Sequence, residues 1–423
     1  MSEPDDSATK LISVSLSRQS KRIHLRTRRF PAVLAVCLFI APWILVALYY
    51  FGLLGRTASR EASVPLFHAK PGPWGELDCF SYVTDPPDGF INSKLFPPAD
   101  VVWTIGGGLS REALKAILDN AEFSAGDREQ LLAGAELTPN QEWKLKPSDD
   151  QVINMTPAGR ASLYKELVKY AANSRQIDPF IFEPKRLDDW LKEAAIDAST
   201  IALLKKLCYT HRDRLLLADT SVLLKRLATE SDKHKLLAVL LRRPTFMLKL
   251  RIAPDAEVRE LASYWGAGGR DGEVFSQIEP MRHNRGWMRE DILMLLPPFA
   301  RDRLYTYPLP DSSEIAQHRD CHWSAFNFFN ATPDDRLTVP KNVIDTLDSE
   351  YVPVKDPTMG DVTMLKTPDN RIIHSSVYIA DDFYFTKNGP SHISPWVLMR
   401  MDDIMAFFPA YENLSINYYR RKK

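Results

Sequence analysis

Asp320-Cys321-His322-Trp323-Ser324-Ala325-Phe326 is the stretch of this chain that decides how its C-terminal part folds. Asp is a residue type that caps helix N-termini, so the pattern predicts a helix that begins at Cys321. Ala325 and Phe328 fall on the same face of the helix as Cys321. This favours packing of that face into a core, with the thiol at the edge of the core. A helix N-terminus lowers the pKa of a thiol, so Cys321 is a candidate nucleophile.

Three short strands are predicted after this helix, over 362–365, 374–379 and 383–388. Gly360-Asp361 is typical of the turn before the first strand, and Ala380-Asp381-Asp382 of a tight turn before the third. This succession predicts an α+β domain in which the cysteine helix packs on a small antiparallel sheet.

His374 heads the second of these strands and is the candidate general base for Cys321. Period-two alternation places Thr386 and Asn388 on one face of the third strand, where a polar side chain can orient the imidazole ring. An amide oxygen accepts a hydrogen bond from an imidazole N–H more firmly than a rotating hydroxyl does. Asn388 is therefore favoured over Thr386 as the orienting residue.

The order of these motifs resembles that of the NlpC-type papain-like cysteine peptidases. The shared features are Asp-Cys at a helix start, Gly-Asp before a strand, a run of the form His-x-x-Val-Tyr-Ile-x-Asp from His374, and a polar residue on the next strand. The resemblance covers roughly 300–410 and implies a papain-like fold. It also implies that Cys321 is the nucleophile, that His374 is the base, and that Thr386 stands where the family has its third residue.

The resemblance implies an activity as well. Members of the family cleave amide bonds in the peptide stems of bacterial cell wall, so cell-wall peptides are the implied substrate, and no metal or organic cofactor is implied. Tyr307 stands about where the family often has a tyrosine near the oxyanion site, and Asp320 and His322 flank the thiol as further candidates for contacts with substrate or oxyanion. The chain departs from the family at His322-Trp323, where Ser-Gly is usual and helps to shape the substrate pocket.

Other interpretations of Cys321 stay open. It can be a buried structural thiol, because free cysteine is often buried. A zinc site built from His318, Cys321, His322 and His374 has suitable ligand types, although adjacent Cys and His seldom both reach one ion. A transglutaminase-like protein shares the Cys–His order but needs a carboxylate on the strand after the histidine. A papain-like fold without catalysis would serve as a scaffold or a peptide-binding module.

The middle of the chain, 76–255, is predicted to be an all-helical domain. Ser110 caps one apolar-periodic segment, and Thr156-Pro157 starts another, with Pro at the first helical position. Residues 245–252 alternate in a strand-like way and mark the approach to the papain-like cysteine hydrolase domain, predicted over 256–423. No residue of the helical domain is assigned to chemistry.

The N-terminal segment 31–54 contains no charged residue and is long enough to predict a transmembrane helix. Six Lys and Arg residues lie between positions 18 and 29, which predicts a basic cytoplasmic tail over 1–30 and a single-pass protein of the inner membrane. The linker 55–75 and the domains after it would then lie outside the cytoplasm. The alternative is a cleaved signal peptide with Thr57-Ala58-Ser59 as its site.

The composition of the chain limits which classes of binding partner are expected. Lys and Arg number 54, as do Asp and Glu, so the net charge is zero and no bulk attraction to nucleic acid is expected. The predicted partners are the membrane lipid bilayer and peptidoglycan peptides. Cys79 and Cys208 form a disulfide or are isolated buried thiols, and either case leaves Cys321 without a partner cysteine.

Overall fold

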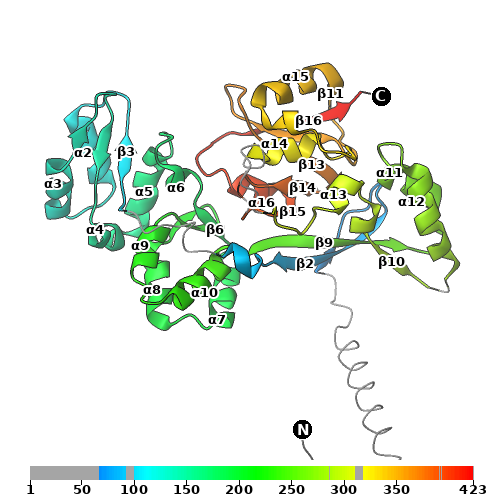
Figure 1. Ribbon diagram of the computed structural model, residues 1–423, viewed down its shortest axis with the longest axis horizontal. Helices are drawn as coiled ribbons and strands as arrows, with labels where there is room; N and C mark the ends of the chain where they lie inside the picture. The colour runs from blue at the N-terminus through cyan, green and yellow to red at the C-terminus, as the bar shows by residue number, and fades with distance from the viewer. Residues whose placement is uncertain are drawn as a thin grey trace, which may run out of the picture. The chain divides into compact units, whose positions relative to one another are not determined.

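The computed structural model describes residues 66–91, 100–284, 286–309, 318–389, 391 and 393–422. All of these belong to one compact unit, Val64–Lys423, which is α+β with several separate sheets (Figure 1). Two large groups of buried apolar side chains organise it. One lies between positions 91 and 241, and the other joins positions 69–79 to 248–398.

Helices and two small antiparallel sheets surround the first apolar core. The helices are α2 (Arg111–Asn120), α3 (Ala125–Ala133), α4 (Asp149–Asn154), α5 (Pro157–Leu167), α6 (Ser174–Ile177), α7 (Pro184–Glu193), α8 (Ala198–Leu207), α9 (Thr220–Lys225) and α10 (Glu230–Leu240). The sheet β3-β5-β4 contains β3 (Trp103–Ile105), β4 (Glu136–Leu137) and β5 (Trp143–Leu145). The sheet β6-β8-β7 contains β6 (Phe180–Phe182), β7 (Tyr209–His211) and β8 (Arg214–Leu217).

The prediction of an all-helical middle domain is therefore wrong. Trp103 and Ile105 of β3 pair with Leu145 and Trp143 of β5, and both β3 residues are fully buried. The strands of these two sheets are only two to four residues long. Segments that short carry too few alternations to stand out beside the longer helical patterns. The run 101–105 does read as a strand, in agreement with β3, but it did not change the prediction of a helical domain.

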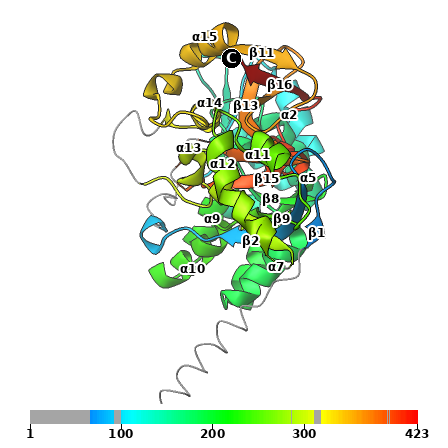
Figure 2. The same cartoon turned by 90° about the vertical axis from the view of Figure 1, so that its right-hand side faces the viewer.

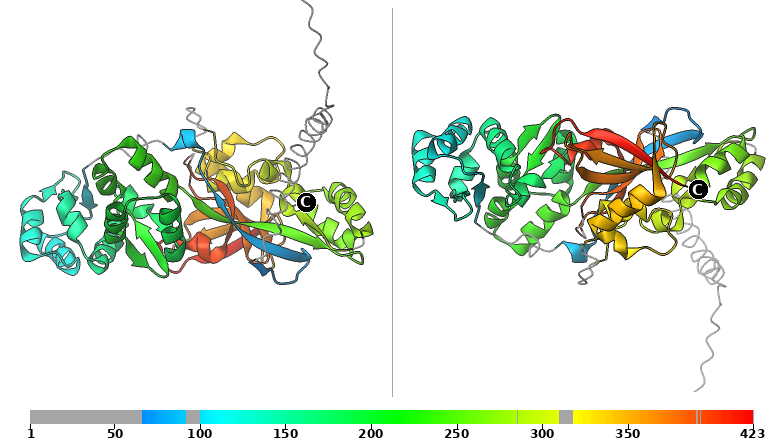
Figure 3. Two further views of the ribbon diagram at one scale, coloured as in Figure 1. Left: turned by 90° about the horizontal axis from the view of Figure 1, so that it is seen from below. Right: turned by 90° about the horizontal axis from the view of Figure 1, so that it is seen from above.

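A long antiparallel ribbon belongs to the second core. β2 (Glu76–Thr84) pairs along its whole length with β9 (Arg243–Ile252), and β1 (Phe67–His68) and β10 (Met288–Asp291) complete the order β1-β2-β9-β10 (Figure 3). The strand-like alternation of 245–252 is confirmed as part of β9.

Two helices, α11 (Val258–Trp265) and α12 (Asp271–Ile278), lie side by side next to this ribbon (Figure 2). Trp265 of α11 is fully buried in the second core, and its indole N–H donates to the carbonyl of Trp74 at 3.0 Å. The helix is thereby anchored to the segment that leads into β2.

A six-stranded antiparallel sheet carries the candidate site. Its order is β11-β16-β12-β13-β14-β15, from β11 (Tyr351–Val354), β12 (Val362–Lys366), β13 (Ile372–Ala380), β14 (Phe383–Lys387), β15 (Trp396–Arg400) and β16 (Ser415–Arg421). The helix α14 (Cys321–Phe326) packs against β13 and β14 (Figure 1). The three strands expected after the cysteine helix are confirmed as β12, β13 and β14.

The described residues form further helices. They are η1 (Asp88–Phe90), η3 (Glu279–His283), η4 (Ile292–Leu295), α13 (Pro298–Arg301), η6 (Asp335–Thr338), α15 (Pro340–Glu350) and α16 (Met401–Ala406). Of these, η6 and α15 contact α14 and lie on the route by which the chain passes from the cysteine helix to the sheet.

The prediction of a membrane protein needs correction. Across the described part of the chain, no helix has the length and the apolar character that crossing a membrane requires. This finding goes against the single-pass protein of the inner membrane that the sequence predicted. The predicted span itself, 31–54, lies outside the described residues, as do the tail before it and most of the predicted linker.

Candidate active site

Cys321 is the first residue of α14, and the helix begins there because Asp320 caps it. One carboxylate oxygen of Asp320 accepts hydrogen bonds from the backbone N–H groups of His322, at 2.9 Å, and Trp323, at 3.0 Å. The predicted helix start and its cap are therefore confirmed. The cysteine side chain is buried, with 6% of the residue exposed.

Contacts from two sides hold the cysteine helix in place. The indole N–H of Trp323 donates to Asp335 at 3.0 Å, and Arg319 donates to both oxygens of the same carboxylate at 3.0 and 2.9 Å. From the sheet, the indole N–H of Trp396 donates to the hydroxyl of Ser324 at 2.9 Å. A rigid first turn keeps the thiol in a fixed position, which nucleophilic chemistry requires.

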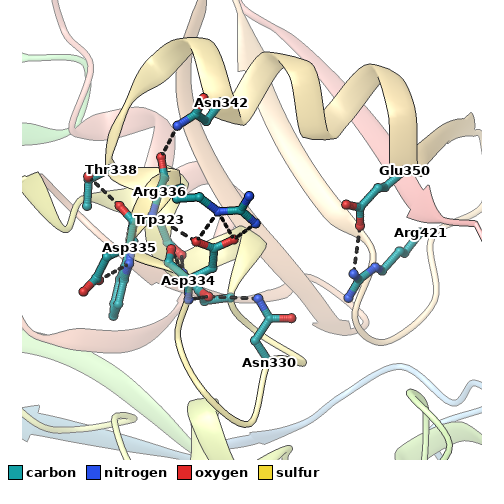
Figure 4. A network of polar contacts seen from close by, with 10 residues as sticks. Trp323, Asn330, Asp334, Asp335, Arg336, Thr338, Asn342, Glu350 and Arg421 are labelled. Carbon is teal, nitrogen blue, oxygen red and sulfur yellow. Dashed lines mark hydrogen bonds and ion pairs between the residues drawn. The ribbon is translucent and has the colours of Figure 1, made fainter.

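The segment after α14 forms its own polar network, which Figure 4 shows from close by. Arg336 of η6 donates to both oxygens of Asp334, the residue that caps η6, and the amide of Asn342 on α15 donates to the carbonyl of Arg336 at 2.8 Å. These bonds fix η6, which carries Asp335 and thereby supports Trp323.

Two imidazoles act on the thiol, and a hydroxyl holds each of them. His374 Nε2 lies 2.8 Å from the hydroxyl oxygen of Thr386, and His322 Nδ1 lies 2.8 Å from that of Ser375. His374 and Ser375 are neighbours on β13, so one strand serves both rings. Both rings also lie within hydrogen-bonding reach of the Cys321 thiol.

The two imidazoles reverse the effect of burial on the thiol. Burial by itself raises the pKa of Cys321, but the charges and hydrogen bonds of His322 and His374 bring that pKa well below its ordinary value. For His322 the sign is opposite: burial lowers its pKa, yet the thiolate raises the pKa to about 9. The site therefore favours a thiolate beside an imidazolium near neutral pH.

The other described cysteines provide an internal comparison. Cys79 and Cys208 are both free and buried, so no disulfide joins them. Burial raises the pKa of each thiol to about 12, because neither has an imidazole to offset it. Of the three cysteines that the structure describes, Cys321 is the one poised to ionise.

The structure decides between the two candidates for the orienting residue. Thr386, rather than the favoured Asn388, makes the hydrogen bond to the ring of His374. The hydroxyl of Thr386 in turn donates to the amide oxygen of Asn388 at 3.5 Å, and the Asn388 amide donates to the sulfur of Met399 at 3.2 Å. Asn388 thus lies one step further from the thiol, and the preference drawn from hydrogen-bond strength alone was wrong.

Tyr307 does not belong with these residues. Its hydroxyl donates to the backbone carbonyls of Thr84, at 3.2 Å, and Leu241, at 3.3 Å. None of its hydrogen bonds to described residues reaches Cys321 or His374. The expectation that Tyr307 lies near the oxyanion site has no support in this geometry.

Lys387 is a charged residue of the site region that sequence reasoning missed. It follows Thr386 on β14 and is completely buried. Burial lowers its pKa to about 7, while the negative charges of Cys321 and Asp320 act in the opposite direction. Its ammonium donates to the carbonyls of Gly389 and Ser391. The available signal was a lysine within an otherwise apolar strand, 383–387.

The zinc alternative rests on a smaller group than predicted. Among the described residues, one set of three potential ligands comes together: Asp320, Cys321 and His322, whose ligating atoms lie within 4.8 Å of one another. One oxygen of Asp320 already accepts two backbone N–H groups. Because structural zinc takes four ligands, we assign these residues to thiolate chemistry instead.

Comparison with known proteins identifies no relative. No protein-family model, no curated protein and no solved structure matches this chain. The resemblance to NlpC-type peptidases stays a prediction, and the function has to be argued from the geometry around Cys321.

Proposed function

We propose that this chain is a cysteine hydrolase that cleaves an amide bond through an acyl-enzyme on Cys321. The observation that carries the proposal is the buried thiol at a capped helix start, acted on by two imidazoles that are each held by a hydroxyl. A structural thiol needs neither a helix N-terminus nor a pair of imidazoles, and Cys79 and Cys208 have none.

In the first half of the reaction, the Cys321 thiolate attacks the carbonyl carbon of the substrate amide. The backbone N–H of Cys321 is one of those that a helix start leaves without an intrahelical partner, and it donates to the oxyanion. The carbon–nitrogen bond then breaks, and the imidazolium of His374 gives its proton to the leaving amine. The products of this half are the free amine and a thioester on Cys321.

In the second half, His374 takes a proton from water, and the resulting hydroxide attacks the thioester. The carbon–sulfur bond breaks, the acid leaves, and the thiolate and imidazolium are restored. Thr386 holds the His374 ring in one orientation during both halves, in the role of third member. His322 supplies a second positive charge beside the sulfur, which compensates for the burial of the thiolate.

The experiment that tests this proposal looks for the covalent intermediate. The full chain is mixed with a panel of peptide amides, quenched in acid after milliseconds to seconds, and examined by intact-mass and peptide mass spectrometry. Cell-wall stem peptides belong in the panel, because the resemblance to NlpC-type peptidases favours them. We expect an acyl adduct on Cys321 and release of amine, and neither product from Cys321→Ser.

The rival proposal is a non-catalytic peptide-binding module, and the low exposure of Cys321 is what favours it. A peptide that binds without an adduct and without amine release, over the whole panel and at any pH between 5 and 9, would support that rival and overturn the hydrolase.

A further inference from the structure

Three neighbouring cavities lie beside the residues that surround His374. The first, of about 160 Å³, has walls from three parts of the chain: 178–181, the start of β9 and the end of the six-stranded sheet. A second, of about 340 Å³, shares Asp178, Asn388 and Phe407 with the first. A third, of about 290 Å³, shares Arg243 and Phe407 with it.

Two contacts connect these cavities to the catalytic groups. Asn388 lines the first and second cavities and accepts the hydrogen bond of Thr386, whose hydroxyl holds the His374 ring. Phe408 lines the second cavity, and its ring lies 5.1 Å from that of His374 between centroids. A molecule in the second cavity would therefore contact Phe408, a direct neighbour of the His374 ring.

Arg243 brings a positive charge into the wall of the first and third cavities. One of its terminal nitrogens donates to the carbonyls of Leu240 and Arg242, and its guanidinium lies 5.7 Å from the centroid of the Phe180 ring. No carboxylate among the described residues is within ion-pair distance of it. Arg214, which lines the third cavity, is different, because Asp403 pairs with it at 2.7 Å.

Asp178 supplies the opposite charge at the rim of the first and second cavities. Its side chain is exposed, and it forms no ion pair with any described residue. Asp178 and Arg243 thus face one cavity and attract each other, but they form no ion pair. Arg243 is partly buried and lacks an ion-pair partner among the described residues, and a ligand carboxylate would supply one, while the ammonium of the same ligand would meet Asp178.

We propose that this row of cavities binds a short peptide with free ends, whose C-terminal carboxylate pairs with Arg243 and whose N-terminal ammonium pairs with Asp178. Arginine suits a carboxylate because its planar donors match the two oxygens. The inference rests on the proposed function in one respect only, namely that the bound peptide is a substrate of Cys321. The binding itself does not require hydrolysis.

The test measures binding by calorimetry on the full chain with Cys321→Ser, so that no turnover occurs. The probes are trialanine with free ends, its C-terminal amide and its N-acetyl derivative. Trialanine should bind, and each blocked peptide should bind about tenfold more weakly or worse, because each loses a charge-assisted contact. Equal affinity of the three peptides, or no binding of trialanine, would overturn the proposal.

Variants assign the two contacts. Arg243→Gln should abolish the preference for a free carboxylate, and Asp178→Asn the preference for a free amine, each leaving the other preference in place. Arg242→Gln is the matched control, since that neighbouring arginine already pairs with Asp85 and Glu193. If Arg243→Gln does not fold, the comparison of free and blocked peptides on the chain with an unaltered cavity still tests whether the cavity recognises both charges.

The two proposals fail separately. If trialanine binds but Cys321 forms no adduct, the proposed peptide site is supported and the proposed hydrolase activity is refuted. If Cys321 forms an acyl adduct but the three peptides bind with equal affinity, the hydrolase is supported and the proposed peptide site is refuted.

Discussion

The imidazole Nε2 of His374 lies 2.8 Å from the hydroxyl oxygen of Thr386, and both side chains are almost completely buried. A hydrogen bond in such surroundings fixes which ring nitrogen carries the proton and which way the ring faces. The other nitrogen is then available to the Cys321 sulfur. In the proposed mechanism, this contact orients His374 as the general base.

Replacing Thr386 should therefore damage turnover more than replacing Asn388. We expect Thr386→Val, which keeps the shape but removes the hydroxyl, to lower kcat by roughly tenfold to a hundredfold, in line with the loss of an orienting residue. Asn388→Ala should lower it less, because its bond to Thr386 is long, at 3.5 Å. Thr386→Ser is the control and should keep most activity. Larger damage from Asn388→Ala would reinstate Asn388 as the orienting residue.

His322 and Ser375 should act on the thiol pKa rather than on proton transfer. His322→Gln removes a positive charge beside the sulfur, so the pKa of Cys321 should rise. Ser375→Ala should raise it by a smaller amount, since it frees the His322 ring without removing it. Thiolate absorbance near 240 nm against pH measures both. An unchanged titration in His322→Gln would remove His322 from the site.

Lys387 should make the stability of the protein depend on pH. Its pKa is lowered to about 7 in the folded chain, against an ordinary value of 10.5. Between these pH values the unfolded chain binds more protons, so stability rises with pH, by roughly 1.4 kcal/mol for each unit of pKa difference. The stability of the natural protein minus that of Lys387→Met should thus increase from pH 7 to pH 10.

Urea unfolding at several pH values measures this difference. Lys341→Met is the control, because the Lys341 side chain is 78% exposed, and its difference from the natural protein should stay flat. A flat difference for Lys387→Met as well would mean that Lys387 keeps an ordinary pKa in the folded chain.

Local signals in the sequence predicted local structure well. Ser110 accepts a hydrogen bond from the backbone N–H of Ala113, and Thr156 does the same for Gly159 with Pro157 at the first helical position. Asp320 caps α14 in the same manner. Caps depend on residues two or three positions apart, so a single sequence contains the information that they need.

What the sequence did not reveal depends on strand pairing. Period two places Thr386 and Asn388 on one face, but the register of β13 against β14, which aligns Val377 with Phe385, decides which of the two reaches the His374 ring. Ser375 was missed for the same reason, because its contact with His322 joins a strand to a helix more than fifty residues away. Such contacts arise only after the chain has packed.

If the thiol at position 321 is activated, alkylation of Cys321 must depend on pH in a way that the other cysteines do not share. The full chain is treated with iodoacetamide from pH 5 to pH 9, and mass spectrometry follows Cys321, Cys79 and Cys208 separately. We predict that Cys321 reacts at pH 6, that the other two stay unlabelled up to pH 9 because their pKa values are near 12, and that His374→Ala slows the reaction of Cys321. Labelling of Cys321 that begins only above pH 8, with no response to His374→Ala, would contradict the account.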